Sequence, residues 1–145
     1  MRDTYERAFN FAMDWEKWKA DDPDDPGGLT IWGVTTKYFP EVVAIIKNMN
    51  PEDSKAYVKN NFYLEKFWMR FGCDELHYPF DWIVFDTAMN TERGAGRIKS
   101  ETDNWRDMIF KRIEYYCDKS NTKYLKGLIN RCLDLQRTIK KRGIA

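Results

Sequence analysis

The sequence "WEKWKADDPDDPGGLTIWGVT", residues 15–35, places an acidic turn between a helix and a short β element. In it, Glu16 precedes four aspartates, two prolines and two glycines. Because residues before proline avoid the α conformation, Pro23 and Pro26 end any helix that reaches this stretch. The β-branched, alternating residues 29–35 favour a small strand or hairpin. The stretch therefore predicts a helix end, a rigid turn and a β element in direct succession.

The residues before the turn have the apolar spacing of a helix. Apolar side chains recur at helical intervals and form one stripe: Tyr5, Phe9, Ala12 and Met13. The next position on this stripe is Glu16. Desolvation there favours the protonated form of a carboxyl group, which is the form that a general acid needs. A glutamate at a helix end can also turn to water, so both interpretations stay open at this point.

Helices dominate the rest of the chain. We predict them at residues 40–49, 51–71 with a break, 79–90, 103–118 and 121–141. Asn50 and Pro51 together form a strong helix start, as a capping residue and a first-turn proline. The length of 145 residues indicates one domain, and we find no internal repeat and no Pro/Ser-rich linker. The predicted fold class is mainly α, a helical bundle with a small β-hairpin near the N-terminal acidic turn.

The charges are balanced in total but unevenly spread. Residues 1–96 carry 11 basic and 17 acidic side chains, whereas residues 97–145 carry 13 and 6. The first interpretation is a solvated surface whose halves neutralise each other. The second is an acidic cleft beside a basic face that meets an anionic partner. We predict no nucleic-acid partner.

We predict no cofactor and no bound metal. Three widely spaced cysteines give neither a disulfide framework nor a zinc pattern. An EF-hand loop that starts at Asp22 fails, because its fifth position is Pro26 and its twelfth is Gly33. The one histidine, His77, has no nucleophile signature around it, and we predict a packing role for it.

The first residues lack the apolar segment of a secretory signal, and no apolar run reaches the length of a membrane span. We expect a monomer without membrane insertion. We also expect synthesis in the cytoplasm without a signal peptide, followed by action elsewhere after release.

Paired carboxyl groups suit the hydrolysis of a glycosidic bond. One carboxylic acid protonates the leaving oxygen, and a second carboxylate acts on the other side as base or nucleophile. Glu16 and an aspartate of the turn can supply both roles. We expect apolar surroundings for Glu16 and solvent around the turn, and this difference moves the two pKa values apart. Trp18 and Trp32 lie close in sequence to these acids. Their rings can stack on sugars or belong to the core.

The pattern E-x5-DPxDPGGxTxxGVT, formed by Glu16 and residues 22–35, resembles the opening motif of glycoside hydrolase family 108. That family comprises bacterial and phage muramidases with a lysozyme-like fold. The later stretches "PFDWIVFDTAMN" and "YLKGLINR" resemble the C-terminal peptidoglycan-binding-type region found with it. In the first of these we expect Asp86 to be a buried residue bonded to backbone, Asn90 or Arg131. The resemblance implies an N-acetylmuramidase, of phage endolysin type, whose partner is bacterial peptidoglycan.

The resemblance also implies roles for single residues. The family's catalytic glutamate falls on Glu16. Phage-type lysozymes place an aspartate nine residues later and a threonine six further on, whereas here Asp25 lies nine after Glu16 and Thr30 five after Asp25. We therefore expect Glu16, Asp25 and Thr30 to be catalytic, and we expect Trp18, Trp32 and Asn90 to bind substrate. Among the four aspartates of the turn, we expect Asp21 and Asp24 to shape its backbone.

The chain departs from the family pattern in three places. The family has Gly-Gly-Tyr where this chain has residues 17–19, often Asn in place of Ile31, and a glycine soon after Asn90. Two alternatives follow: a wall-binding module without catalysis, and a hydrolase of another amino-sugar polymer such as chitin. The expected organisation is one lysozyme-like domain over residues 1–145. Residues 1–72 would carry the catalytic glutamate and residues 73–145 a peptidoglycan-binding-type half.

Overall fold

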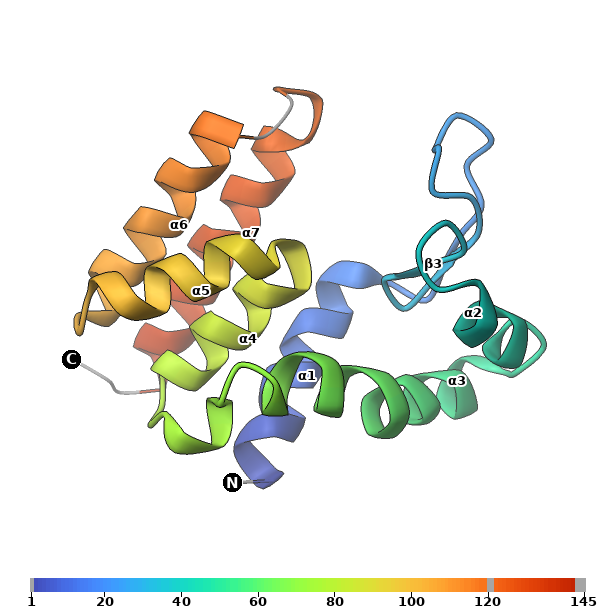
Figure 1. Ribbon diagram of the computed structural model, residues 1–145, viewed down its shortest axis with the longest axis horizontal. Coiled ribbons are helices and arrows are strands. Elements are labelled where there is room, and N and C mark those ends of the chain that lie inside the picture. Colours follow the sequence, from blue (N-terminus) through green and yellow to red (C-terminus); the bar gives the residue numbers. More distant parts are fainter. Residues whose placement is uncertain (1, 120–121, 143–145) are drawn as a thin grey trace. The chain divides into compact units, whose positions relative to one another are not determined.

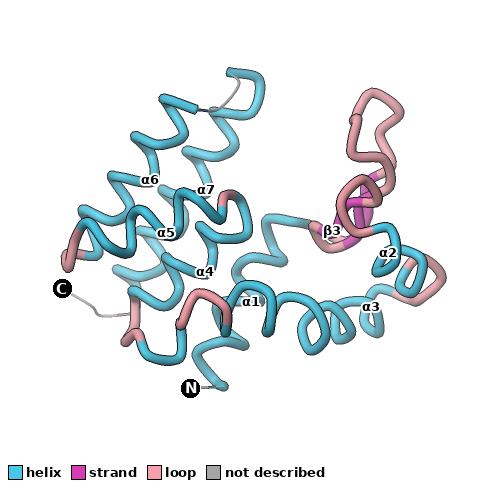
Figure 2. Tube along the Cα trace, viewed as in Figure 1, coloured by secondary structure: helices cyan, strands magenta, loops and turns pink. Residues whose placement is uncertain are grey.

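A computed structural model describes residues 2–119 and 122–142. The chain divides into two compact units, an N-terminal unit of Arg2–Lys66 and a C-terminal unit of Phe67–Ala145. The elements in order are α1 (Arg2–Glu16), β1 (Lys19–Ala20), β2 (Thr30–Ile31), β3 (Val34–Thr35), α2 (Pro40–Ile46), α3 (Pro51–Val58), the π-helix η1 (Lys59–Met69), the 3₁₀ turn η2 (Cys73–Glu75), α4 (Phe80–Asn90), α5 (Glu92–Glu101), α6 (Trp105–Lys119) and α7 (Thr122–Lys141) (Figure 1). Helices make up most of the described chain (Figure 2), so the predicted mainly α fold with a small β element is confirmed.

Helix α1 buries the stripe that the sequence predicts. Each of its members is at most 5% exposed: Tyr5, Phe9, Ala12 and Met13. Within the N-terminal unit, the ring of Phe9 lies 5.8 Å from that of Tyr63 in η1. The hydroxyl of Tyr5 donates a hydrogen bond of 2.6 Å to the carbonyl of Lys59. These contacts hold α1 against η1.

A tight hairpin follows the acidic turn, as predicted. Ile31 pairs with Val34, and the two-residue loop between them consists of Trp32 and Gly33 with φ of 49° and 81°. Two positive φ values in succession define a type I′ turn, whose twist matches that of the flanking strands. Ile31 and Val34 are buried. Strand β1, which is exposed and was not predicted, pairs antiparallel with β2.

Helix α3 begins as the sequence predicts. The side chain of Asn50 accepts a hydrogen bond of 2.8 Å from the N–H of Asp53, and Pro51 occupies the first turn. At Lys59 the winding changes from α to π without an interruption. The prediction of a break within residues 51–71 is therefore wrong, because the helix is continuous and only its winding changes. The helix ends before Gly72. This residue has φ of 67°, in the left-handed region that glycine adopts without steric strain.

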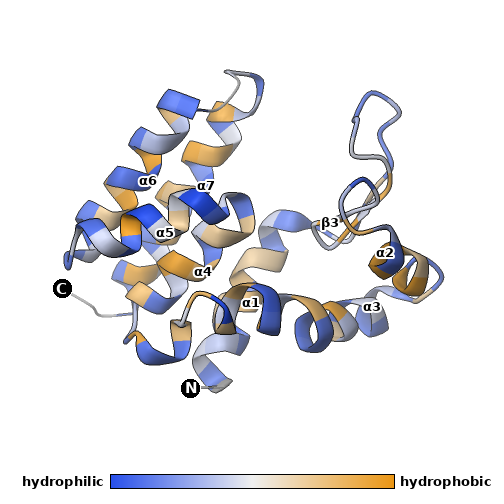
Figure 3. Ribbon diagram, in the orientation of Figure 1, coloured by the Kyte–Doolittle hydropathy of each residue, from blue (hydrophilic) through white to orange (hydrophobic). Residues whose placement is uncertain are grey.

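In the C-terminal unit, α4 is the central helix. All its residues from Asp81 to Ala88 are buried, and Figure 3 shows much of α4 in the orange of apolar side chains. A helix that is buried all round lies in the interior of its unit. Helices α5 and α6 pack against α4, and α7 packs against α6.

A buried ion cluster joins three of these helices. Asp86 of α4 is 1% exposed and accepts hydrogen bonds from Arg131 of α7. Nη1 of Arg112, from α6, lies 2.7 Å from Oδ2 of Asp86 and forms an ion pair with it. Burial alone would raise the pKa of Asp86, but the two guanidinium groups outweigh it and hold that pKa below its ordinary value. The predicted structural role of Asp86 is confirmed, with Arg112 as an additional partner.

Helix α5 was not predicted, because its sequence contains two glycines. Gly94 and Gly96 each lower helix propensity by about 1 kcal/mol relative to alanine. In the structure, Oγ1 of Thr91 caps the helix by accepting a hydrogen bond of 3.1 Å from the N–H of Gly94. A methyl group on Gly94 would lie 2.5 Å from Cγ2 of Thr91, so the cap itself requires glycine there.

Candidate active site

Glu16 is the last residue of α1 and is half-buried. The helix ends at this point because Lys17 takes the left-handed conformation, with φ of 63°. The N–H of Lys17 still closes the last turn by donating to the carbonyl of Met13 at 3.0 Å. Left-handed residues after a helix are usually glycine, and the family resemblance places glycine at this position. Lys17 thus preserves a backbone turn for which glycine is the unstrained residue.

The carboxyl group of Glu16 lies against the tip of the hairpin. A methyl group on Gly33 would lie 3.0 Å from Oε2 of Glu16 and 2.5 Å from the hydroxyl oxygen of Tyr63. The same hydroxyl donates a hydrogen bond of 2.6 Å to the carbonyl of Trp32. The hairpin turn, the catalytic candidate and a buried tyrosine therefore meet at one position.

The acidic turn between β1 and β2 is shaped by two of its aspartates. The N–H of Asp24 donates to Oδ1 of Asp22 at 2.9 Å, and the N–H of Gly27 donates to Oδ1 of Asp25 at 2.8 Å. Such bonds to the backbone two residues ahead are the Asx turns that aspartate favours. The expectation that Asp21 and Asp24 would shape the turn is wrong: the acceptors are Asp22 and Asp25. Asp25 is nevertheless exposed, and only one of its oxygens accepts this bond.

Thr30 lies in β2, on the strand that follows the turn. It pairs across the hairpin with Thr35, and both side chains lie on the face opposite the buried Ile31 and Val34. Its hydroxyl donates a long hydrogen bond of 3.4 Å to the carbonyl of Gly28. Oγ1 of Thr35 is buried without a hydrogen-bond partner in the described structure. The hairpin thus carries two threonines in a cross-strand pair, and the hydroxyl group of Thr35 is buried.

The two candidate tryptophans differ in how firmly their side chains are held. Trp18 is 39% exposed, and the amine of Lys19 lies 5.9 Å from the centre of its ring. Trp32 is fastened to α3, because its Nε1 donates to Oγ of Ser54 at 3.0 Å and to the carbonyl of Pro51 at 3.2 Å. Trp18 is therefore better placed than Trp32 to stack on a sugar.

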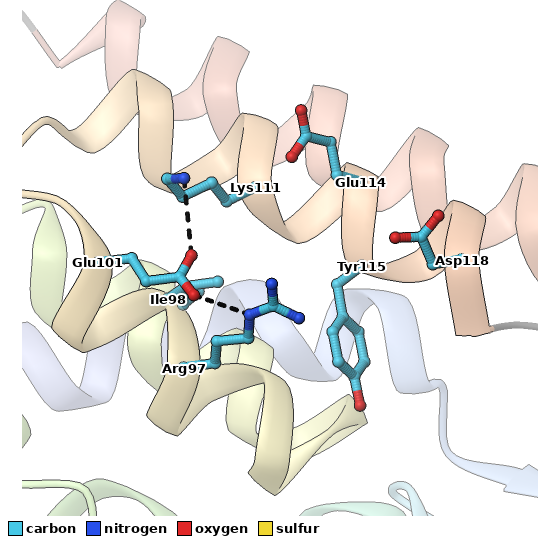
Figure 4. Close-up of a pocket in the computed structure, with 7 residues that line it drawn as sticks. All are labelled: Arg97, Ile98, Glu101, Lys111, Glu114, Tyr115 and Asp118. Carbon is cyan, nitrogen blue, oxygen red and sulfur yellow. Dashed lines mark hydrogen bonds and ion pairs between the residues drawn. The ribbon is translucent and has the colours of Figure 1, made fainter.

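Asn90 belongs to the C-terminal unit. It is exposed at the end of α4, and its amide donates to the carbonyl of Asp86 at 3.0 Å. The same unit has a polar hollow of about 80 Å³ between α5 and α6 (Figure 4). There Glu101 forms ion pairs with Arg97 and Lys111. None of the residues singled out in the sequence lines this hollow.

The described residues contain no group of three or more His, Cys, Asp and Glu side chains that could hold a metal ion. The described cysteines, Cys73, Cys117 and Cys132, are free thiols. His77 is exposed and packs edge-on against Phe80, with ring centres 5.1 Å apart, in agreement with the packing role expected for it. No described helix is long and apolar enough to span a membrane.

The sequence model of one family, described as glycosyl hydrolase 108, matches residues 9–91, which is more than half of the chain. The chain belongs to the glycosyl hydrolase 108 family. It is therefore a glycoside hydrolase, as the sequence motif indicated. The matched segment of this family 108 glycosidase contains every candidate named above, from Glu16 to Asn90.

A solved structure supports the fold of this family 108 glycosidase. SagA of Brucella abortus is similar over 97% of this chain and 96% of that chain, with a TM-score of 0.74 and 16% sequence identity. At that identity the likeness shows the fold alone. No curated protein matches the sequence.

Two residues of the site were missed by sequence reasoning. Gly33 was part of the family motif, but its contact with Glu16 was not foreseen. Tyr63 carried no signal at all, because its spacing in the sequence is that of an ordinary core residue. Both are found only once the hairpin and η1 of this family 108 glycosidase are folded.

Proposed function

We propose that this family 108 glycosidase is an N-acetylmuramidase. It hydrolyses the β-1,4 bond between N-acetylmuramic acid and N-acetylglucosamine in bacterial peptidoglycan. The observation that carries the proposal is the Glu16 carboxyl group, half-buried at a helix end and packed against Gly33 of the hairpin. It lies within the segment that matches the family.

In the proposed mechanism, Glu16 is the general acid that protonates the leaving oxygen. It gives its proton to that oxygen as the glycosidic bond breaks. Asp25 is the second carboxylate. It is exposed to solvent, and one of its oxygens is not committed to the turn by the bond to Gly27.

Asp25 activates a water molecule that attacks the sugar from the opposite face, and Thr30 helps to hold this water. Such a mechanism inverts the configuration at the anomeric carbon, whereas a covalent intermediate on the second carboxylate would retain it. The bond from the N–H of Gly27 holds one oxygen of the Asp25 carboxylate against the turn, which suits a base that acts through water. NMR of the newly formed reducing end should show the α-anomer first, and a β-anomer product would exclude inversion.

The test of the function is Glu16→Gln, which keeps size and hydrogen bonding but removes the transferable proton. Clearing of a purified peptidoglycan suspension should slow by roughly 10²–10⁴-fold. Glu6→Gln is the matched control, because Glu6 is a second glutamate of α1 whose ion pair with Lys59 is exposed. Its rate should equal that of the wild type. Near-native clearing by Glu16→Gln would contradict the assignment.

The wild-type protein separates the remaining alternatives. Mass spectrometry of the soluble products should show fragments that end in reducing N-acetylmuramic acid. Adsorption to the wall without release of fragments would indicate a binding module. Hydrolysis of chitin in preference to peptidoglycan would indicate another amino-sugar polymer.

The place of action is part of the same proposal. Peptidoglycan lies outside the cytoplasmic membrane, so an enzyme made in the cytoplasm acts on it after release, as a phage endolysin does. Expression in bacteria should therefore cause lysis only when a separate pore-forming protein is co-expressed. Lysis by the enzyme alone would contradict this.

A further inference from the structure

We propose that Tyr63 is a positioning residue for Glu16, an inference that rests on the proposed function. Tyr63 lies in η1, is 2% exposed and belongs to the same N-terminal unit as Glu16. It acts through the hairpin turn, without contact to the sugar. The role is to fix the place of the acid that protonates the leaving oxygen.

The ring and the hydroxyl of Tyr63 are both held in place. Phe62 packs edge-on against the ring at a centre distance of 4.9 Å, and Phe9 of α1 lies 5.8 Å away. The hydroxyl donates a hydrogen bond of 2.6 Å to the carbonyl of Trp32. This carbonyl belongs to the two-residue loop of the hairpin, so the bond ties the loop directly to η1.

Gly33 transmits this restraint to the acid. The point at which its Cβ would stand lies 2.5 Å from the hydroxyl oxygen of Tyr63 and 3.0 Å from Oε2 of Glu16. The two side chains therefore approach the same side of one Cα atom. Gly33 cannot be replaced without displacing the carboxyl group or the hydroxyl, even apart from its φ of 81°.

The position of the acid matters more for the rate than for the affinity. A general acid must lie within hydrogen-bond reach of the oxygen that it protonates. A displacement of about 1 Å can cost 10²-fold in rate. Loss of the Tyr63 hydroxyl would remove the restraint on the Trp32 carbonyl, while the bonds from Trp32 to Ser54, Pro51 and Trp18 would remain. The hairpin loop would therefore loosen on the side of this carbonyl, next to the surface against which the Glu16 carboxyl group packs.

The first experiment compares two tyrosines. Tyr63→Phe removes only the hydroxyl, and Tyr5→Phe is its matched control. The Tyr5 hydroxyl also donates a bond of 2.6 Å to a backbone carbonyl, that of Lys59, in the same unit. Both variants should lower the melting temperature by a few degrees, as expected for one lost hydrogen bond. On a soluble tetrasaccharide of alternating N-acetylglucosamine and N-acetylmuramic acid, only Tyr63→Phe should lower kcat, by roughly 10-fold, with KM unchanged.

The second experiment asks whether Tyr63 acts through Glu16. In the Glu16→Gln background, adding Tyr63→Phe should cause no further loss of kcat, because the acid that it positions is already absent. A full further 10-fold loss in that background would overturn the inference. Equal kcat values for Tyr63→Phe and Tyr5→Phe would overturn it as well. Near-native activity of Glu16→Gln would instead contradict the proposed function itself, so the two failures are distinguishable.

A glycine pair tests the same contact even if Tyr63→Phe fails to fold. Gly33→Ala and Gly72→Ala carry similar backbone strain, with φ of 81° and 67°. A methyl group on Gly72 would meet only the flexible end of Lys99, at 3.2 Å, whereas one on Gly33 would meet Glu16 and Tyr63. Gly33→Ala should therefore lower kcat at least 10-fold more than Gly72→Ala. Equal kcat values for the two would overturn the inference.

Discussion

A single carboxylate, that of Asp86, binds the guanidinium group of Arg131 through Nε at 3.1 Å and Nη2 at 2.6 Å. The two residues stand 45 positions apart in the chain and connect α4 to α7. Arg112 adds a second buried guanidinium to the same carboxylate. The centre of the C-terminal unit therefore holds one negative and two positive charges.

Asp86→Asn should destabilise this unit strongly. It removes the carboxylate that pairs with two buried guanidinium groups, which costs about 3–5 kcal/mol in the free energy of unfolding. Urea unfolding at neutral pH measures the loss, and the exposed Glu114→Gln on α6 is the control, with a change of less than about 0.5 kcal/mol. Because the pKa of Asp86 is lowered in the folded state, its contribution is present above the ordinary aspartate pKa of about 4 and is lost in stronger acid. Equal stability of Asp86→Asn and wild type would contradict the cluster's role.

Asp81 should have the opposite pH dependence. Burial raises its pKa to about 6, despite the hydrogen bond of 2.8 Å that its Oδ1 accepts from the N–H of Trp82. Its favourable contribution is therefore fully present below about pH 4 and is lost as pH rises through about 6. The loss should amount to about 3 kcal/mol in the free energy of unfolding. Asp81→Asn should remove this slope between pH 4 and 7, and the same slope in the variant and the wild type would refute the assignment.

Lys17→Gly should stabilise the N-terminal unit. Lys17 adopts φ of 63°, which costs a residue with a side chain roughly 1–2 kcal/mol and glycine almost nothing. Glycine also has more freedom to lose on folding, so the net gain should be about 1 kcal/mol. Thermal unfolding measures it, with Lys19→Gly in the exposed strand β1 as a control that should not stabilise. A lower melting temperature for Lys17→Gly would show that the lysine side chain stabilises the fold by more than its backbone strain destabilises it.

Asp25→Asn should separate catalysis from turn formation. Asn retains the oxygen that accepts from the N–H of Gly27, so the turn should persist while the base is lost. Clearing of peptidoglycan should slow by roughly 10²–10⁴-fold. Asp22→Asn changes an aspartate with the same kind of bond, to Asp24, and should be active within about twofold. Equal losses for both variants would assign the whole turn a structural role.

The elements that sequence predicted well are those specified by local rules. The prolines of the acidic turn fix its bends, Asn50 and Pro51 begin α3, and the positive φ of Gly33 suits a two-residue hairpin. Helix α5 escaped prediction because the packing of Gly94 on Thr91 is visible only in the folded chain. The aspartates that shape the turn were assigned wrongly, because neighbouring acids of equal chemistry differ only in the backbone conformation that each adopts.

The winding of η1 makes the site sensitive to a change in chain length. The hydrogen bonds of a π-helix join residues five apart, whereas those of an α-helix join residues four apart. Removal of the exposed Asn60 would favour α winding between Lys59 and Met69. Each residue of an α-helix turns by about 100°. Such a deletion would rotate Tyr63 away from the Trp32 carbonyl, so we expect one lost codon to lower activity although every residue of the family motif remains in place.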